Sequence, residues 1–318
     1  MMVGAAAVAW LVRRLRHSMA KAKKTTAHAH AASLPLGGAP ALSPAALRAL
    51  VEEDPIDHAV IEVRRGSSQE ASSSGASELK AVPVTLSDLP GVLTDPTRGR
   101  GGAPALRLRP DRLTFLVFVG ESEGDMQEAA RVASSLGYRG VATLKGGTAA
   151  LEAAPPGPAP RLLGRDAVAL LLGLGSLPPH AGAVVIDVRR PDELALYGAL
   201  PGAASVPVSE LLGALQCPES DWARRYRFPK PGPGQPVVFT CRTNRRAKWA
   251  AQLARDAGYR DVLVHRAGAH GWRLGLGVRA YPAFEEGEMP PTPQASPEEV
   301  LDEAAGLADL KSHGLLDE

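Results

Sequence analysis

Long apolar runs are missing from this sequence of 318 residues. The longest candidate, Met1 to Val12, ends at Arg13 and is shorter than the roughly 20 residues that a membrane-spanning helix requires. The sequence therefore predicts no membrane span.

Cysteine and aromatic residues are also scarce. Two cysteines, Cys217 and Cys241, are too few for a disulfide framework or a four-cysteine zinc site, and they fit a reducing compartment. Aromatic residues make up 4% of the chain, too few for the stacking surfaces of proteins that bind single-stranded nucleic acid. The net charge of +2 gives no global basic footprint either. We therefore expect no nucleic-acid partner. We also expect no metal and no cofactor.

Acidic residues are absent from the start of the chain and crowded at its end. Residues 1–51 contain seven Lys or Arg and no acid, whereas residues 285–318 contain ten acids and one Lys. An acid-free, Ala- and Arg-bearing N-terminus is typical of an organelle transit peptide. The alternatives are a disordered basic tail or an extension upstream of a start at Met19. We expect residues 1–40 to be a basic leader that directs the protein to the mitochondrion or chloroplast. If they are not such a leader, we expect the protein to be cytoplasmic.

The remainder of the chain repeats itself. Matching residues recur at an offset of 121, namely Phe118 and Phe239, Gly137–Arg139 and Gly258–Arg260, and Gly147 and Gly268. Upstream, Val60–Arg65 matches Val185–Arg190 at an offset of 125, and Val82–Val84 matches Val206–Val208 at 124. Chance similarity rarely keeps its order across three blocks. We interpret the chain as a duplication.

Both copies predict the same order of elements. A capped helix opens each copy, after Ser43-Pro44 and after Asp166, and a short strand follows it, ending at Glu62 or Asp187. A second strand, 113–119 or 237–240, leads through a loop into an Ala-rich helix that ends at Gly137 or Gly258. A last strand follows at 141–144 or 262–265. Strands alternating with helices predict an α/β fold with two domains, each a parallel β-sheet flanked by helices on both faces.

Composition divides the chain further. The Pro-rich stretch 153–161 is expected to link a domain at 41–152 to a domain at 162–280. Ser67–Ser77 is of low complexity and is expected to be a flexible loop. The acidic tail, 281–318, is expected to form at most a helix after Ser296-Pro297 and to serve solvation.

Cys241 lies where a predicted strand ends and a helix is about to begin. The loop reads Cys241-Arg242-Thr243-Asn244-Arg245-Arg246. Backbone N–H groups at a helix N-terminus, together with three arginines, predict an anion site and a thiolate of lowered pKa. The pattern indicates a nucleophile beside a site for an anionic substrate. The alternative is a buried, inert cysteine with arginines that face solvent.

Several motifs in the second copy occur in the order found in a known family. They are Asp187-Val188-Arg189, Glu193, Pro201-Gly202-Ala203, Val206-Pro207, Cys241 with Arg246-Ala247, and Ala267-Gly268 with Trp272. This set, over about residues 160–275, resembles a rhodanese domain. The segment 207–231 is in addition similar to the single-domain thiosulfate:glutathione-type sulfurtransferases. The whole chain is thus similar to tandem rhodaneses.

This resemblance implies sulfur transfer through a persulfide on Cys241. Thiosulfate or a similar donor would supply the sulfur, and cyanide or a thiol such as glutathione or thioredoxin would accept it. Arg242, Thr243, Asn244, Arg245 and Arg246 would bind the donor, while Asp187 and Arg189 would support the geometry of loop and sheet. No metal takes part.

Two other functions are compatible with the same fold. A Cys-x₅-Arg phosphatase or arsenate reductase would need Arg at position 247, which is Ala, whereas four residues separate Cys241 from Arg246. A non-enzymatic scaffold or sulfide-signalling protein would have no need of three arginines around one cysteine. We therefore favour the enzyme.

The first copy lacks the predicted nucleophile. Gly120 stands in place of Cys241, and Glu121, Glu123 and Asp125 replace the arginines, so an acidic loop would repel thiosulfate. We expect this copy to be degenerate and to support its partner. Outside the motif we expect Cys217 to be a surface cysteine, His265 and His270 to have no metal-binding or catalytic role, and Trp272 to be core packing.

Overall fold

The computed structural model describes residues 38–65, 74–95, 106, 108–109, 111, 113–175, 182–275, 277–295 and 297–316. Residues 39–318 form one compact unit. The predicted leader lies almost wholly outside the described residues. Within the described part of the chain, no helix is long and apolar enough to cross a membrane.

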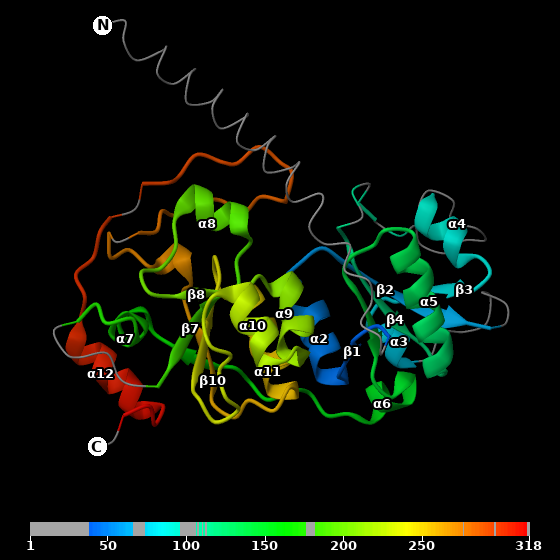
Figure 1. The fold of residues 1–318 in the computed structure, drawn as a ribbon, viewed down its shortest axis with the longest axis horizontal. Coiled ribbons are helices and arrows are strands. Elements are labelled where there is room, and N and C mark those ends of the chain that lie inside the picture. The colour runs from blue at the N-terminus through cyan, green and yellow to red at the C-terminus, as the bar shows by residue number, and fades with distance from the viewer. Residues whose placement is uncertain are drawn as a thin grey trace, which may run out of the picture. The chain divides into compact units, whose positions relative to one another are not determined.

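The first half of the unit is built on a five-stranded parallel sheet with the strand order β1-β5-β4-β2-β3 (Figure 1). Its strands are β1 (Ala41–Leu42), β2 (His58–Arg64), β3 (Val82–Thr85), β4 (Phe115–Val119) and β5 (Val141–Leu144). Its helices are α2 (Pro44–Glu53), α3 (Ser74–Glu78), α4 (Leu89–Thr94), α5 (Glu123–Ser135) and α6 (Gly147–Ala153).

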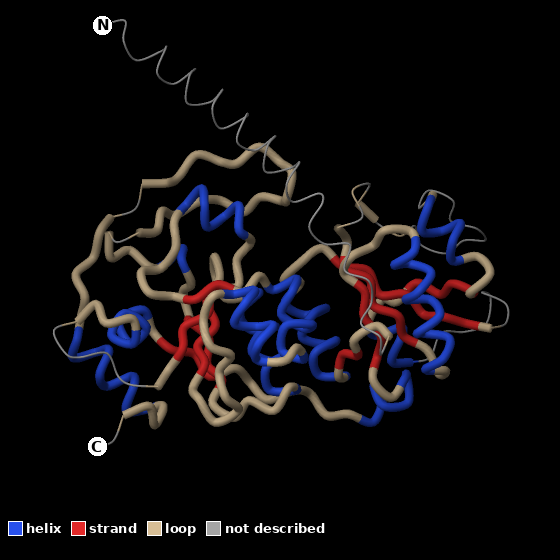
Figure 2. The backbone as a smooth tube through the Cα atoms, in the orientation of Figure 1, coloured by secondary structure: helices blue, strands red, loops and turns tan. Residues whose placement is uncertain are grey.

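The second half has the same architecture, with the strand order β6-β10-β9-β7-β8. Its strands are β6 (Arg161–Leu163), β7 (Val184–Asp187), β8 (Ala204–Ser205), β9 (Val237–Thr240) and β10 (Val262–His265). Its helices are α7 (Arg165–Leu171), α8 (Pro191–Tyr197), α9 (Val208–Gln216), α10 (Glu219–Tyr226), α11 (Arg245–Asp256), the 3₁₀ turn η2 (Ala269–Gly271) and α12 (Glu303–Ser312). Figure 2 shows the two groups of strands, each with helices around it. The predicted fold class, two parallel sheets flanked by helices, is confirmed.

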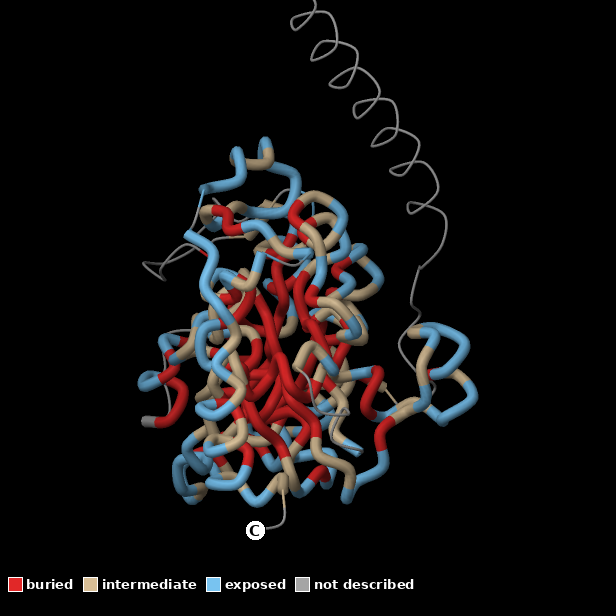
Figure 3. Tube along the Cα trace, turned by 90° about the vertical axis from the view of Figure 1, so that its left-hand side faces the viewer, coloured by how far each residue is buried: buried red, intermediate tan, exposed pale blue. Residues whose placement is uncertain are grey.

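The strands are buried on both faces, as a parallel sheet between helices requires. All residues of β4, β5, β9 and β10 are buried, and Figure 3 shows such buried segments gathered in the interior. Val185, Val238 and Leu263 pack in one cluster with α7 and Trp272. Because successive side chains alternate between faces, Phe239 points to the opposite face. Trp272 is thus core packing, as predicted.

Local signals explain where several helices begin and end. The Ser43 hydroxyl accepts a hydrogen bond from the Ala46 N–H (3.0 Å), and Pro44 occupies the first turn of α2. Gly137 and Gly258 follow α5 and α11 in the left-handed region, with φ of 93° and 94°. α7 begins at Arg165, one residue before the predicted cap, with Gly164 in the cap position.

Two segments expected to be irregular or solvated contain packed helices. Of the predicted loop Ser67–Ser77, residues 67–73 lie outside the described residues, but Ser74 onward forms α3, which contacts α6 and buries Ala76 completely. The acidic tail was expected to serve solvation, and this prediction was wrong. Its helix α12 packs against α7 and buries Leu310 completely, and the partly buried Leu307 and Leu315 pack against the same hydrophobic cluster.

Helix α2 of the first half packs against α11 of the second. The Trp249 Nε1–H donates to the Ala46 carbonyl (3.2 Å), and the Trp249 ring meets Phe115 edge to face. Lys248 Nζ bonds the Glu53 carboxylate at 2.7 Å. The first copy therefore packs against α11, the helix that follows the Cys241 loop.

Candidate active site

Cys241 directly follows β9, the central strand of the second sheet, and precedes α11. Carboxyl ends of parallel strands are the usual position of binding sites in α/β folds. The Cys241 side chain is buried, with 1% of the residue exposed. The backbone N–H groups of Thr243 and Ala247 are directed to its sulfur, so the loop surrounds the thiol with donors.

A second loop clamps the Cys241 loop from outside. The Ala269 N–H donates to the Cys241 carbonyl (2.8 Å) and the His270 N–H to the Arg242 carbonyl (2.7 Å). Gly268 allows this approach with φ of 57°. A Cβ at this position would lie 2.0 Å from the Thr243 carbonyl oxygen and 2.5 Å from that of Cys241. The loop conformation thus depends on a residue without a side chain.

Burial raises the pKa of the Cys241 thiol above its ordinary value. The positive charge of Arg246 and the Ala247 and Thr243 amides act in the opposite direction, and Asp187 adds to the increase. The predicted lowered pKa is therefore wrong for this conformation. The helix N-terminus and the arginine were identified correctly, but the loss of solvation outweighs them.

The three arginines of the loop have three different partners. Arg246 makes a bidentate ion pair with Glu193 of α8, with Nη2 2.8 Å from Oε1. Arg242 Nη1 donates to the Tyr281 carbonyl at 3.3 Å. Arg245 turns to the first copy, where it contacts the Glu53 carbonyl and the Asp54 carboxylate (3.2 Å). The loop therefore does not gather its arginines around the sulfur.

The other residues of the predicted site have structural contacts. Asn244 Nδ2 donates to the Arg266 carbonyl at 2.9 Å, and Thr243 contributes its amide to the sulfur. Asp187, the last residue of β7, pairs with Arg189 at 2.7 Å, and both side chains are buried. Arg189 Nη2 also donates to the Gly198 carbonyl (2.9 Å), which ties β7 to the end of α8.

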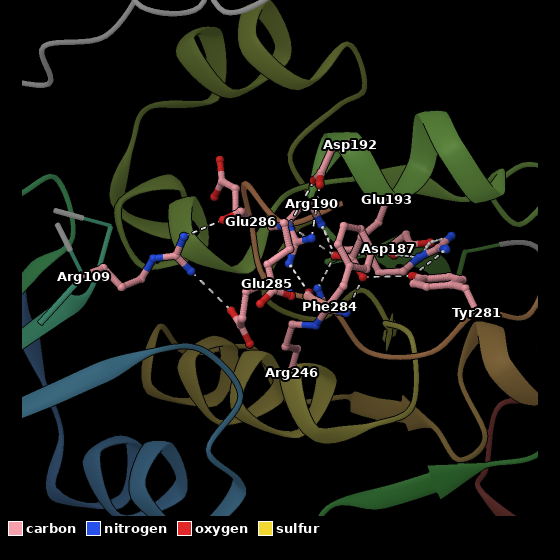
Figure 4. Close-up of polar contacts among 12 residues, drawn as sticks. Arg109, Asp187, Arg190, Asp192, Glu193, Arg246, Tyr281, Phe284, Glu285 and Glu286 are labelled. Carbon is pink, nitrogen blue, oxygen red and sulfur yellow. Dashed lines mark hydrogen bonds and ion pairs between the residues drawn. The ribbon is translucent and has the colours of Figure 1, made fainter. Parts of the chain in front are cut away.

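Glu193 and Tyr281 complete a buried polar network that sequence reasoning did not assign (Figure 4). The Tyr281 hydroxyl lies 2.8 Å from Glu193 Oε1 and 3.3 Å from Arg189 Nη1. Arg246 holds the pKa of the Glu193 carboxyl near 2, against the opposing effect of burial. Glu193 belongs to the set of motifs that resembles a rhodanese domain and could have been assigned a role on that basis. Tyr281 lies beyond the motifs, and no sequence signal marks it.

The first copy keeps this scaffold and lacks the nucleophile. The Thr148 N–H donates to the Gly120 carbonyl (3.0 Å), as Ala269 does to Cys241. Gly147 is the counterpart of Gly268, since a Cβ there would lie 2.6 Å from the Gly120 carbonyl oxygen. A Cβ at Gly120 would lie 2.9 Å from the Val63 carbonyl oxygen. The backbone at this position therefore has no room for a cysteine without a shift.

The ion pairs of the first copy resemble those of the second, except that one position carries the opposite charge. Glu62 pairs with Arg64, as Asp187 does with Arg189. Asp125, at the position of Arg246, pairs with Arg65 at 2.7 Å. An acid therefore stands where the second copy places the arginine that favours a thiolate.

The remaining candidates are not part of the Cys241 loop. Cys217 is half-buried at the end of α9. His265 is fully buried, with Nδ1 3.0 Å from the Thr240 hydroxyl, and burial lowers its pKa to about 3. Across the described residues, no cluster of three or more His, Cys, Asp or Glu is placed to hold a metal.

Comparison with known proteins agrees with this architecture in the second copy. The sequence model of the family described as "Rhodanese-like domain" matches residues 174–274. The chain is 33% identical over 96 residues to Rhodanese domain-containing protein CG4456 of Drosophila melanogaster, covering 30% of this chain and 86% of that protein. It is 36% identical over 100 residues to the human Thiosulfate:glutathione sulfurtransferase (31% and 86%). It is 32% identical over 94 residues to Thiosulfate sulfurtransferase RDL2, mitochondrial, of Saccharomyces cerevisiae (30% and 62%). With these motifs on that fold, the chain belongs to the rhodanese family.

Proposed function

We propose that this protein is a thiosulfate sulfurtransferase that works through a persulfide on Cys241. A rhodanese-like domain with relatives named thiosulfate sulfurtransferases supports sulfurtransferase activity in general. The observation that carries the finer proposal is the position of Cys241. It is buried at the carboxyl end of the central strand, with two backbone amides directed to its sulfur and the charge of Arg246 acting on it.

The first half-reaction loads the enzyme. The Cys241 thiol loses its proton to solvent water, and the thiolate attacks the outer sulfur of thiosulfate. An S–S bond forms to Cys241 as the S–S bond of the donor breaks, and sulfite leaves with the electron pair of that bond. The amides of Thr243 and Ala247 and the charge of Arg246 stabilise both the attacking thiolate and the persulfide anion.

The second half-reaction returns the thiolate. A thiol acceptor such as glutathione or thioredoxin attacks the outer persulfide sulfur as its thiolate and leaves as a persulfide, while cyanide leaves as thiocyanate. The electron pair of the broken S–S bond returns to Cys241, so no net oxidant or reductant is consumed.

The donor anion is expected to meet the loop arginines unequally. Arg242 donates a 3.3 Å hydrogen bond to the Tyr281 carbonyl, which is a neutral acceptor. This contact leaves the charge of Arg242 suited to bind the sulfonate. The charge of Arg246 stabilises the Cys241 thiolate, and Glu193 holds Arg246 in place through an ion pair. Arg245 has its partners in the first copy, and we assign it a role in joining the copies.

The domain organisation follows from the repeated scaffold. We assign residues 41–152 to a degenerate rhodanese-like domain, 153–161 to a linker and 162–280 to the catalytic domain. The shared strand order and the matching Gly147 and Gly268 clamps support this division. The first domain would support the second through α2.

A mitochondrial location is proposed as well. The N-terminal 51 residues contain no acid, and the yeast relative is named as a mitochondrial protein.

The test is sulfur transfer by the purified protein. With thiosulfate as donor and glutathione or cyanide as acceptor, we expect turnover that Cys241→Ser abolishes and the matched variant Cys217→Ser retains. After thiosulfate alone, mass spectrometry should find an adduct of about 32 Da, one sulfur atom, on Cys241. Equal background rates for wild type and Cys241→Ser with thiosulfate, 3-mercaptopyruvate and persulfide donors would instead support a scaffold or signalling role.

A further inference from the structure

A segment beyond the family match packs against the candidate site. The rhodanese match ends at residue 274, and the chain then runs along α8. The Arg279 N–H donates to the Tyr197 carbonyl (2.8 Å), and the Tyr281 ring stacks on the Tyr197 ring with centroids 3.7 Å apart. Tyr197 in turn donates its hydroxyl to the Pro291 carbonyl (2.8 Å). This segment is therefore fixed on the catalytic domain.

Tyr281 is the member of this segment that joins the buried charges. Its hydroxyl lies 2.8 Å from Glu193 Oε1 and 3.3 Å from Arg189 Nη1, and the residue is 1% exposed. A guanidinium can only donate, so the Tyr281 oxygen accepts from Arg189 and its proton is directed to Glu193 Oε1. Burial and the Glu193 charge raise the pKa of Tyr281, which keeps this proton on the phenol.

The same residue reaches both ends of the Cys241 loop. Its carbonyl accepts from Arg242, which follows the nucleophile. Its hydroxyl bonds the carboxylate that holds Arg246, at the start of α11. The first copy ends in the linker and has Pro160 at the equivalent offset, so this connection belongs to the second copy.

We propose that Tyr281 is a positioning residue for the Cys241 reaction, which holds Glu193 so that Arg246 is fixed beside the sulfur. This inference rests on the proposed function for its kinetic consequence, but its effect on the thiol does not require sulfur transfer.

The effect of Tyr281→Phe has a defined sign. Without the phenol proton, the negative charge of Glu193 is less neutralised and Arg246 is less firmly held. Both changes disfavour the Cys241 thiolate, because Arg246 stabilises it and a nearby carboxylate opposes it. The thiol pKa should therefore rise, and we expect the thiolate fraction at pH 7 to fall by roughly three- to tenfold.

The experiment measures alkylation of Cys241 by iodoacetamide, a neutral reagent, from pH 6 to 10 in the full chain carrying Cys217→Ser. We expect Tyr281→Phe to be alkylated about three- to tenfold more slowly at pH 7, with the profile displaced to higher pH. The matched control is Tyr197→Phe, which removes a hydroxyl from the same stacked pair without touching Glu193 and should keep the wild-type profile. The kcat/KM for thiosulfate should fall in Tyr281→Phe, because less of the thiol is ionised, and should not fall in Tyr197→Phe.

The outcomes separate this inference from the proposed function. Equal alkylation profiles for wild type and Tyr281→Phe, or equal displacement in both Tyr variants, overturn the positioning role. Displaced alkylation without any sulfur transfer in wild type supports the positioning role and refutes the proposed function. If Tyr281→Phe does not fold, 3-fluorotyrosine at position 281 takes its place. Its more acidic phenol bonds Glu193 more strongly and should speed alkylation at pH 7, and an unchanged rate would refute the inference.

Discussion

Replacing Gly268 by alanine is expected to slow sulfur transfer severely while the fold survives. The new Cβ would lie 2.0 Å from the Thr243 carbonyl oxygen and 2.5 Å from the Cys241 carbonyl oxygen, well inside contact distance. The backbone at Gly268, with φ of 57° and ψ of −164°, is also one that residues with a Cβ rarely adopt. The two loops must separate, and the amides of Thr243 and Ala247 then lose their alignment with the sulfur.

The structure provides a matched control in the first copy. A Cβ at Gly147 would lie 2.6 Å from the Gly120 carbonyl oxygen, in the same clamp around a loop without a nucleophile. Strain of this kind costs about 1–3 kcal/mol at either position, and each kcal/mol lowers Tm by about 2–8 °C depending on the size of the cooperative unit. Gly147→Ala should therefore be destabilised to a similar degree and remain active.

The assay pairs thermal unfolding by circular dichroism with thiosulfate:cyanide transfer at a temperature where both variants are folded. Misalignment of two donors to the sulfur should lower kcat/KM by about two orders of magnitude or more in Gly268→Ala, by analogy with loss of an oxyanion-type donor. Gly147→Ala should stay within about threefold of wild type, a barrier change under 1 kcal/mol. Full activity in Gly268→Ala, or equal losses in both variants, would refute the role assigned to the clamp.

Two further predictions concern buried groups away from the sulfur. Burial lowers the pKa of His265 to about 3. His265 therefore becomes protonated near pH 6.5 in the unfolded chain but stays neutral in the folded chain. The free energy of unfolding should therefore fall by up to about 1.4 kcal/mol per pH unit as the pH drops from about 6.5 towards 3. The NMR signals of the His265 imidazole should not move between pH 5 and 8. A titration of these signals in that range would contradict the burial argument. Leu310→Ala on α12 should lower the free energy of unfolding in urea by about 2–5 kcal/mol, because the side chain is fully buried. The control Val300→Ala, at a residue 89% exposed, should change it by less than about 0.5 kcal/mol. Equal effects would mean that the tail does not pack on α7.

Much of the fold was predictable because its signals are local. The strands 141–144, 237–240 and 262–265 have the bounds predicted for them, since short β-branched runs between turn residues have few alternatives. The glycines after α5 and α11 end those helices as expected, since glycine favours the left-handed region. The helix α3 was missed because five residues in a Ser-rich stretch carry no periodic pattern, and contacts with α6 decide it.

The Cys241 loop lies between β9 and α11 as the sequence predicted, whereas the contacts of its side chains were not predicted. The loop after β9 was located from its cysteine and arginines, but their partners could not be assigned. Arg245 bonds Asp54, 191 residues away in the sequence, and Tyr281 bonds Glu193 across 88 residues. No spacing rule reaches so far. The pKa of Cys241 was misjudged for the same reason, because burial depends on elements from the whole domain.

The parallel α/β class and the cysteine between a strand and a helix were predictable from the sequence, because periodicity, turn residues and order along the chain indicate them. The same signals predicted the duplication. Tertiary contacts were needed to show that this cysteine is buried, that the charge of Arg246 acts on it, and that Tyr281 joins the polar network. These properties depend on which distant side chains share a low-dielectric interior, where losing solvent and gaining one charged partner compete directly.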